Sequence, residues 1–269
     1  MRTPIRYAGG KSKAYDFISS YIPFWPRPKR IISPFIGGGS LEVRWAHEMG
    51  VEIKGFDIFD VLVNYWQHQI SEPERIYDIL KGLEPSKEQY DEIKDTLLHW
   101  DKVQELFKKW KTNHYDRKSI ELADDTGAAY YWYNHNLSYG PMFLGWFSSI
   151  YLKKESLYEN AIQRVKNFNV PNMSVECKSF EEVIPSYPND FLYCDPPYYM
   201  EKKEGDDDNN HITDHLFSVT MIVTGLEKTI KTLSLNYRSG IIHFNKVKQE
   251  LEITDKTEIL QKHLTRFLL

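Results

Sequence analysis

The sequence has little of what marks secreted, metal-binding or membrane proteins. Only two of its 269 residues are cysteines, Cys177 and Cys194, which provides neither a disulfide framework nor paired cysteine ligands for a metal. No apolar run approaches the ~20 residues of a membrane span, and the first residues lack the apolar segment of a signal peptide. A net charge of −4 argues against a protein that coats nucleic acid through bulk positive charge. We therefore expect a cytoplasmic protein without a metal ion or a membrane contact.

The composition favours a folded chain with a substantial core. Hydrophobic residues make up 41% of the chain and aromatic residues 14%, so disorder is not expected. The length suits one large domain or a domain with an inserted lobe.

The most distinctive stretch is Asp195-Pro196-Pro197-Tyr198, which follows an apolar run at 191–194. The run predicts a buried strand. The two prolines then fix the backbone and remove hydrogen-bond donors, which gives a stiff loop at the strand's carboxyl end. Ligands bind at that edge in open α/β sheets. The alternative interpretation is an ordinary strand followed by a proline turn.

A second pattern is typical of nucleotide-binding α/β units. A strand over 30–36 leads into a glycine turn at 37–39, then a helix over 40–49 and a second strand over 51–58. Asp57 stands at the end of the second strand, where an acid can bind ribose hydroxyls. The glycines do not form the dinucleotide fingerprint, so the pattern favours a nucleoside cofactor without a pyrophosphate. A glycine-rich turn of any α/β protein is the alternative.

The first residues carry a further glycine turn, Gly9-Gly10, followed by Lys11. Glycines at this place let the backbone approach a ligand closely, and a helix is expected over 12–21. The spacing is not that of a phosphate-binding P-loop. A helix entry with a solvated lysine explains the same residues.

The middle of the chain differs in composition from both ends. Residues 71–124 are charged with a helical pattern, and an aromatic, glycine-broken loop is expected over 137–149. His135, just before the loop, has a structural or a functional role. Aromatic and basic side chains suit contacts to bases and phosphates, although solvated faces and core packing explain them equally. The residues considered for DNA contact are Lys108, Lys109, Lys111, Ser138, Tyr139, Lys153 and Lys154.

Taken in order, four segments resemble the Dam-type (D12 class) adenine-N6-specific DNA methyltransferases of the restriction-modification kind. They are Tyr7-Ala8-Gly9-Gly10-Lys11, Pro34-Phe35-Ile36-Gly37-Gly38-Gly39-Ser40, Phe56-Asp57-Ile58 and Asp195-Pro196-Pro197-Tyr198. The family pattern usually has Trp where this chain has Tyr7.

The resemblance implies a Rossmann-like α/β fold, with a mostly parallel sheet covered by helices on both faces. It implies a catalytic and cofactor-binding domain formed by residues 1–70 and 170–269, with a helical target-recognition insertion at 71–169. The implied cofactor is S-adenosylmethionine, and the implied partners are double-stranded DNA and a cognate restriction endonuclease. The implied cofactor contacts are Tyr7, Gly9, Gly10, Lys11, Phe35, Gly37, Gly38, Gly39, Asp57 and Asp195.

The chemistry of adenine methylation fits the acidic tetrad. The exocyclic amine of adenine is a poor nucleophile, and Asp195 and the carbonyl of Pro196 can each accept one of its N–H groups. The rigid Pro196-Pro197 pair would hold both acceptors, and Tyr198 would stack on a base flipped out of the duplex. The predicted catalytic residues are therefore Asp195, Pro196, Pro197 and Tyr198.

Beyond Met200 the family pattern fades. We expect a helix over 214–233, a late strand over 232–237 and a helical tail over 246–269. Two alternatives to an active enzyme follow. One is a catalytically impaired DNA-binding relic of such an enzyme. The other is an RNA or protein-amide methyltransferase, in which Asn commonly replaces the residue corresponding to Asp195.

Overall fold

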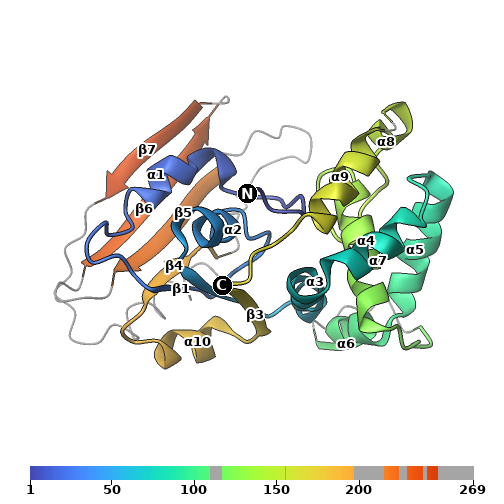
Figure 1. The fold of residues 1–269 in the computed structure, drawn as a ribbon, viewed down its shortest axis with the longest axis horizontal. Coiled ribbons are helices and arrows are strands. Elements are labelled where there is room, and N and C mark those ends of the chain that lie inside the picture. The colour runs from blue at the N-terminus through green and yellow to red at the C-terminus, as the bar shows by residue number, and fades with distance from the viewer. Residues whose placement is uncertain (110–116, 155, 197–214, 224–228, 239–240, 248–269) are drawn as a thin grey trace, which may run out of the picture.

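The structure is a computed structural model that describes residues 1–109, 117–154, 156–196, 215–223, 229–238 and 241–247. Within these residues a seven-stranded sheet lies beside a group of helices (Figure 1). The strands are β1 Arg30–Ser33, β2 Glu52–Asp57, β3 Met173–Cys177, β4 Phe191–Cys194, β5 His215–Val223, β6 Thr229–Arg238 and β7 Ile241–Val247. The helices are α1 Tyr15–Ser19, α2 Glu42–Arg44, α3 Asp60–Ser71, α4 Pro73–Lys81, α5 Lys87–His99, α6 Asp101–Lys109, α7 Asp124–Leu137, α8 Ile150–Lys153, α9 Ser156–Lys166 and α10 Phe180–Ser186, with short 3-10 and π turns at Ser12–Ala14 and Trp45–Met49.

The strand order β3-β2-β1-β4-β5-β6-β7 creates a switch point in the parallel half of the sheet. β1 pairs in parallel with β2 on one side and with β4 on the other, and β3 adds in parallel outside β2. The chain therefore leaves β1 toward one edge and returns beside it as β4. Ligands of open α/β sheets bind at such a point, outside the carboxyl ends of the strands.

The other half of the sheet corrects two predictions. β5, β6 and β7 are antiparallel to their neighbours, so the sheet is parallel only from β3 to β4 instead of mostly parallel. The helix predicted over 214–233 is wrong, because that range holds β5 and the start of β6. Its sequence is rich in β-branched residues and alternates apolar and polar residues near its end, which is a strand pattern. The late strand predicted over 232–237 is confirmed within β6.

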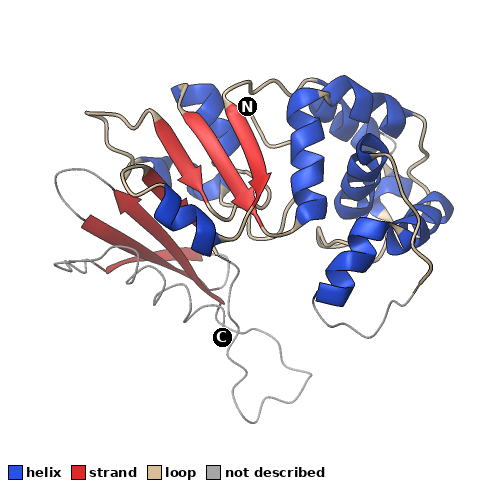
Figure 2. Cartoon of the chain, turned by 90° about the horizontal axis from the view of Figure 1, so that it is seen from below, coloured by secondary structure: helices blue, strands red, loops and turns tan. Residues whose placement is uncertain are grey.

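Successive residues of each central strand face opposite sides of the sheet, which gives two cores. Ile31 and Tyr193 join the larger core with α1, α2 and α3. Ile32 and Leu192 join a smaller core in which Val183 of α10 packs against the sheet. Helices thus cover both faces of the parallel strands, as predicted (Figure 2).

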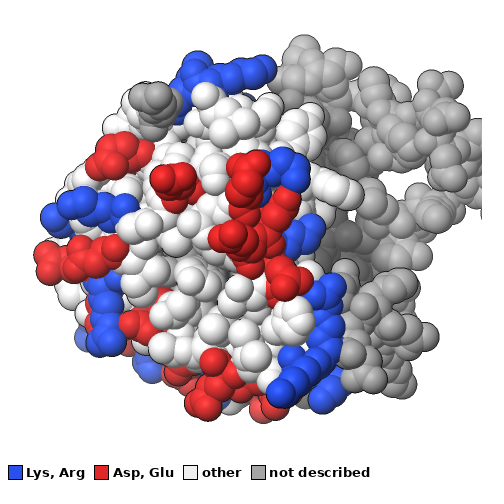
Figure 3. Space-filling view, turned by 90° about the vertical axis from the view of Figure 1, so that its right-hand side faces the viewer, with Lys and Arg blue, Asp and Glu red and all other residues white. Residues whose placement is uncertain are grey.

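The helical group α4–α9 lies within the range predicted for the insertion, between β2 and β3 in the chain. Its core is continuous with that of the sheet, because Tyr65 of α3 packs against Tyr131 of α7 at 5.8 Å between ring centroids. The outer face of the group carries interspersed acidic and basic side chains (Figure 3). Whether this group acts as a recognition domain stays a prediction. In the part of the chain that the structure describes, no helix is both long and apolar enough to cross a membrane.

Candidate active site

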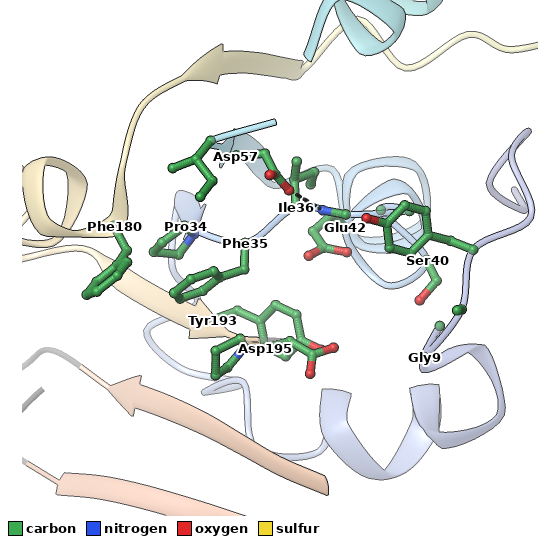
Figure 4. Close-up of a pocket in the computed structure, with 18 of the residues that line it drawn as sticks. Gly9, Pro34, Phe35, Ile36, Ser40, Glu42, Asp57, Phe180, Tyr193 and Asp195 are labelled. Carbon is green, nitrogen blue, oxygen red and sulfur yellow. Dashed lines mark hydrogen bonds between the residues drawn. The ribbon is translucent and has the colours of Figure 1, made fainter. Parts of the chain in front are cut away.

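A cavity of about 620 Å³ opens at the carboxyl ends of the parallel strands. Five segments line it: Tyr7–Gly10, the loop 34–40 after β1, Asp57 and Ile58 at the end of β2, Ser179–Glu181 after β3, and Asp195 with Pro196 after β4. Glu42, Lys109 and Tyr193 complete the lining. These segments are far apart in sequence and meet only because the switch point brings their strands together (Figure 4). Described residues from all four segments singled out in the sequence therefore line one pocket.

The strongest interaction at the pocket is an ion pair between Lys11 and Asp195. The ammonium of Lys11 lies 2.9 and 2.7 Å from the two carboxylate oxygens and donates to the carbonyl of Gly9 at 2.8 Å. The side chains are 8% and 18% exposed, so both charges are largely shielded from water. The hydroxyl of Tyr193 lies 3.4 Å from the same carboxylate. Lys11 is thus no solvated lysine.

Asp57 is fixed at the end of β2 by backbone donors. The N–H of Gly37 lies 3.2 Å from one carboxylate oxygen and the N–H of Phe59 lies 3.0 Å from the other. Burial raises the pKa of Asp57 above its usual value, and these backbone hydrogen bonds act against that shift. The acid and the glycine turn are therefore one hydrogen-bonded unit.

The glycine turn is shaped as much by packing as by the cavity. A Cβ on Gly38 would lie 2.3 Å from the Cβ of Tyr7, and one on Gly39 would lie 2.9 Å from the ring of Trp66. Gly37 and Gly39 also have positive φ angles of 45° and 58°. Only glycine fits these positions without displacing Tyr7 or Trp66.

Helix α7 holds the first segment in place. The ring of His135 stacks on Tyr7 with centroids 5.2 Å apart and on Tyr131 at 5.4 Å. Burial lowers the pKa of His135 to about 4, so the ring is neutral near pH 7. The amide of Asn136 accepts the backbone N–H of Arg6 at 2.8 Å. His135 therefore has a structural role, which the sequence left open.

Two pocket features were missed at the sequence level. The ring of Phe180, the first residue of α10, lies 5.4 Å from that of Phe35 and forms an apolar wall with it. Opposite this wall, Glu42 lines the cavity although it is only 3% exposed (Figure 4). Glu42 follows the glycine turn in an apolar stretch, and no spacing rule marked it.

Only some of the remaining predicted site residues line the pocket. Pro196 lines the pocket, whereas Pro197, Tyr198 and Lys111 lie outside the described residues. Lys109 reaches the pocket from the end of α6, and Lys108 beside it is exposed.

The aromatic loop after α7 is a hairpin with two exposed aromatic rings at its base. Its base is closed by the N–H of Tyr139 donating to the carbonyl of Trp146 at 2.6 Å. Tyr139 and Trp146 are 79% and 82% exposed, and Lys153 and Lys154 are exposed nearby in the chain. Ser138 is fully buried instead, with its hydroxyl donating to the carbonyl of His135 at 2.8 Å. Its position gives no support to the predicted contact between Ser138 and a ligand.

The parallel strands, the glycine turn with its acid and the pocket at the switch point define a nucleoside-binding α/β enzyme. The model of the D12 class N6 adenine-specific DNA methyltransferase family matches residues 7–260, and the chain belongs to that family. It is therefore an S-adenosylmethionine-dependent, adenine-specific DNA methyltransferase with a restriction-modification context. No curated protein matches the chain.

The donor set in the pocket suits an organic cofactor. Among the described residues, no group of three or more His, Cys, Asp or Glu side chains is arranged to hold a metal ion. The cavity is lined by aromatic and apolar side chains together with carboxylates. That combination fits a nucleoside with a charged tail.

Proposed function

We propose that this chain binds S-adenosylmethionine in the pocket and transfers its methyl group to N6 of an adenine flipped out of duplex DNA at a specific site. The observation that carries the proposal is the meeting of Asp57 and Asp195 at one cavity, with Lys11 paired to Asp195. In this assignment Asp57 accepts the ribose hydroxyls, while the wall of Phe35 and Phe180 takes the adenine ring of the cofactor. The remaining contacts predicted for the cofactor come from Tyr7, Gly9, Gly10 and the turn at Gly37, Gly38 and Gly39.

Asp195 then receives the target base. Its carboxylate accepts one N6–H, and the carbonyl of Pro196 accepts the other. An oxygen of a carboxylate accepts about two hydrogen bonds, so pairing with Lys11 is compatible with this role. The two acceptors favour a pyramidal nitrogen whose lone pair points at the methyl group, and alignment supplies the remaining rate enhancement. Pro197 and Tyr198 keep their predicted roles in rigidity and stacking.

The DNA contacts in this proposal come from the pocket side of the molecule. The exposed rings of Tyr139 and Trp146 at the base of the hairpin stack on bases, and Lys109 lines the pocket, with Lys108 and Lys111 close to it in the chain. Lys153 and Lys154 add phosphate contacts beyond the hairpin. The mixed charge on the outer face of the helical group (Figure 3) favours this side over that face. A cognate restriction endonuclease acting on the same site is the proposed partner.

A flipped target base can be detected directly. Duplex DNA with 2-aminopurine at the target position gains fluorescence when the base leaves the stack. We expect this gain with the wild-type protein and cofactor, and no gain when the 2-aminopurine stands at an adenine outside the recognition site. Tight binding without any fluorescence gain would contradict flipping and favour the non-catalytic relic.

The proposed contact between Asp57 and the ribose of S-adenosylmethionine can be tested by a binding measurement. Calorimetry should give a higher dissociation constant for S-adenosylmethionine with Asp57→Ala, because the ribose loses its acceptor. The control is Asp190→Ala, which should leave binding unchanged. It removes a carboxylate at the amino end of β1, away from the pocket, that pairs with Arg30 at 2.7 Å. Equal dissociation constants for wild type and Asp57→Ala would place the cofactor elsewhere.

A further inference from the structure

Glu42 is a buried carboxyl group in the pocket for which the proposed function has no role. It is 3% exposed, begins α2 directly after the glycine turn, and lines the same cavity as Asp57 and Asp195. Figure 4 shows it between these two acids. A carboxyl group is rarely buried so completely without a charged partner, because its ionised form loses hydration.

The groups that hold Glu42 are neutral. The hydroxyl of Ser33 donates to Oε1 at 2.8 Å, and the N–H of Leu41 donates to Oε2 at 3.2 Å. Among the residues that the structure describes, no lysine, arginine or histidine forms an ion pair with Glu42. Asp195, in contrast, has the ammonium of Lys11. The carboxylate of Glu42 is therefore oriented by hydrogen bonds but has no opposite charge.

The other charged groups at the cavity favour a cationic ligand. The lining includes four carboxyl groups, from Glu42, Asp57, Glu181 and Asp195, and one ammonium, that of Lys109. The ammonium of Lys11, which is not part of the lining, pairs with Asp195. Carboxyl groups therefore still outnumber ammonium groups at the cavity. Burial raises the pKa of Glu42 to about 7, and the charge of Asp195 adds to the effect. A bound positive charge favours the ionised form of such a carboxyl.

We propose that the carboxylate of Glu42 recognises the sulfonium charge of S-adenosylmethionine and sets the preference for this cofactor over the product S-adenosylhomocysteine. This rests on the proposed function. During transfer the methyl carbon bonds to N6 of adenine, and the S–C electron pair stays on sulfur. N6 then releases one proton to solvent. Sulfur becomes a neutral thioether, so Glu42 no longer faces a cation and the product is held less tightly. Glu42 is thus a specificity and positioning residue.

The test compares two dissociation constants across pH. Calorimetry gives the constants for S-adenosylmethionine and S-adenosylhomocysteine at intervals from pH 6 to pH 8, which also locates the midpoint of any change. The ionised fraction of a group with a pKa near 7 rises from about one tenth to about nine tenths over this range. The preference for S-adenosylmethionine should therefore rise roughly tenfold in the wild type. In Glu42→Gln it should be weak and the same throughout this range.

The design separates Glu42 from the other titrating groups. Glu42→Gln retains Tyr7, Asp57, Lys109, Glu181, Tyr193 and the Lys11–Asp195 pair, so a difference between the two proteins isolates one carboxyl. Ser33→Ala serves as a second variant, because it removes a hydrogen bond that stabilises the ionised form but keeps the charge. Its pH dependence should persist with a midpoint at higher pH.

Each outcome decides a different claim. An unchanged preference and pH dependence in Glu42→Gln would overturn the role of Glu42 while leaving the cofactor site intact. If Glu42→Gln does not fold, an unshifted midpoint in Ser33→Ala overturns it instead. A wild-type protein that binds neither ligand would refute the proposed function and this inference with it.

Discussion

Breaking the ion pair between Lys11 and Asp195 should destabilise the protein strongly. Lys11→Met keeps the length of the side chain but removes the charge, which leaves a carboxylate with 18% exposure without its main cation. Breaking a fully buried pair costs ~3–5 kcal/mol. Since Asp195 retains some water contact, we expect a loss of about 2–4 kcal/mol in the free energy of unfolding.

A double-mutant cycle isolates the pair from the other contacts of each residue. Urea unfolding of wild type, Lys11→Met, Asp195→Asn and the double variant should give a coupling energy of about 2 kcal/mol. The matched control is the pair of Arg30 and Asp190, which is also 2.7 Å long but has side chains 32% and 21% exposed. Its coupling should be about 1 kcal/mol or less.

Two results would contradict a strong coupling between Lys11 and Asp195. If the effects of Lys11→Met and Asp195→Asn simply add, the ammonium does not stabilise the carboxylate in the folded protein. Equal coupling energies for this pair and for Arg30–Asp190 would show that shielding from water does not strengthen the interaction at the pocket.

Three other perturbations test separate parts of the molecule. Gly38→Ala should lower the free energy of unfolding by about 1–3 kcal/mol through the contact with Tyr7, and it should weaken binding of S-adenosylmethionine. Gly82→Ala is the control, because its Cβ would meet the nearest atom at 3.4 Å. It should change stability and binding little. Because the folded pKa of Glu42 is about 7 and the unfolded value is lower, the folded state binds the extra proton. Stability should thus fall between pH 5 and pH 7.5, by up to about 3 kcal/mol, and fall less in Glu42→Gln. Trp146→Ala should weaken DNA binding without changing cofactor affinity, and Trp25→Ala, which removes an aromatic ring that is 88% exposed, is its control.

The parallel half of the fold was predictable because its signals are local. The apolar runs around Ile31, Ile53 and Leu192 mark buried strands, and the glycines and Asp57 mark where two of them end. The family match over residues 7–260 confirms the resemblance drawn from four short segments. Their meeting at one pocket follows from the strand order, which right-handed parallel connections restrict.

The rest depended on contacts that no local pattern contains. The antiparallel strand β5 and the start of β6 were missed because the residues over 214–233 were interpreted as a helix, although the rest of β6 was predicted. Glu42 was missed because its burial depends on packing of α2 that brings its carboxylate onto the hydroxyl of Ser33. Ser138 was considered for DNA contact, yet it is buried and its hydroxyl donates to the carbonyl of His135. Each of these depends on how distant segments pack.

The central claim is that this pocket methylates adenine through Asp195. The most direct measurement is the formation of N6-methyladenine in duplex DNA incubated with labelled S-adenosylmethionine, detected by mass spectrometry, for wild type and Asp195→Ala. We expect label on adenine N6 with the wild type and none with Asp195→Ala, while circular dichroism confirms that the variant is folded. Equal methylation by both proteins, or label appearing only in RNA or protein, would contradict the claim.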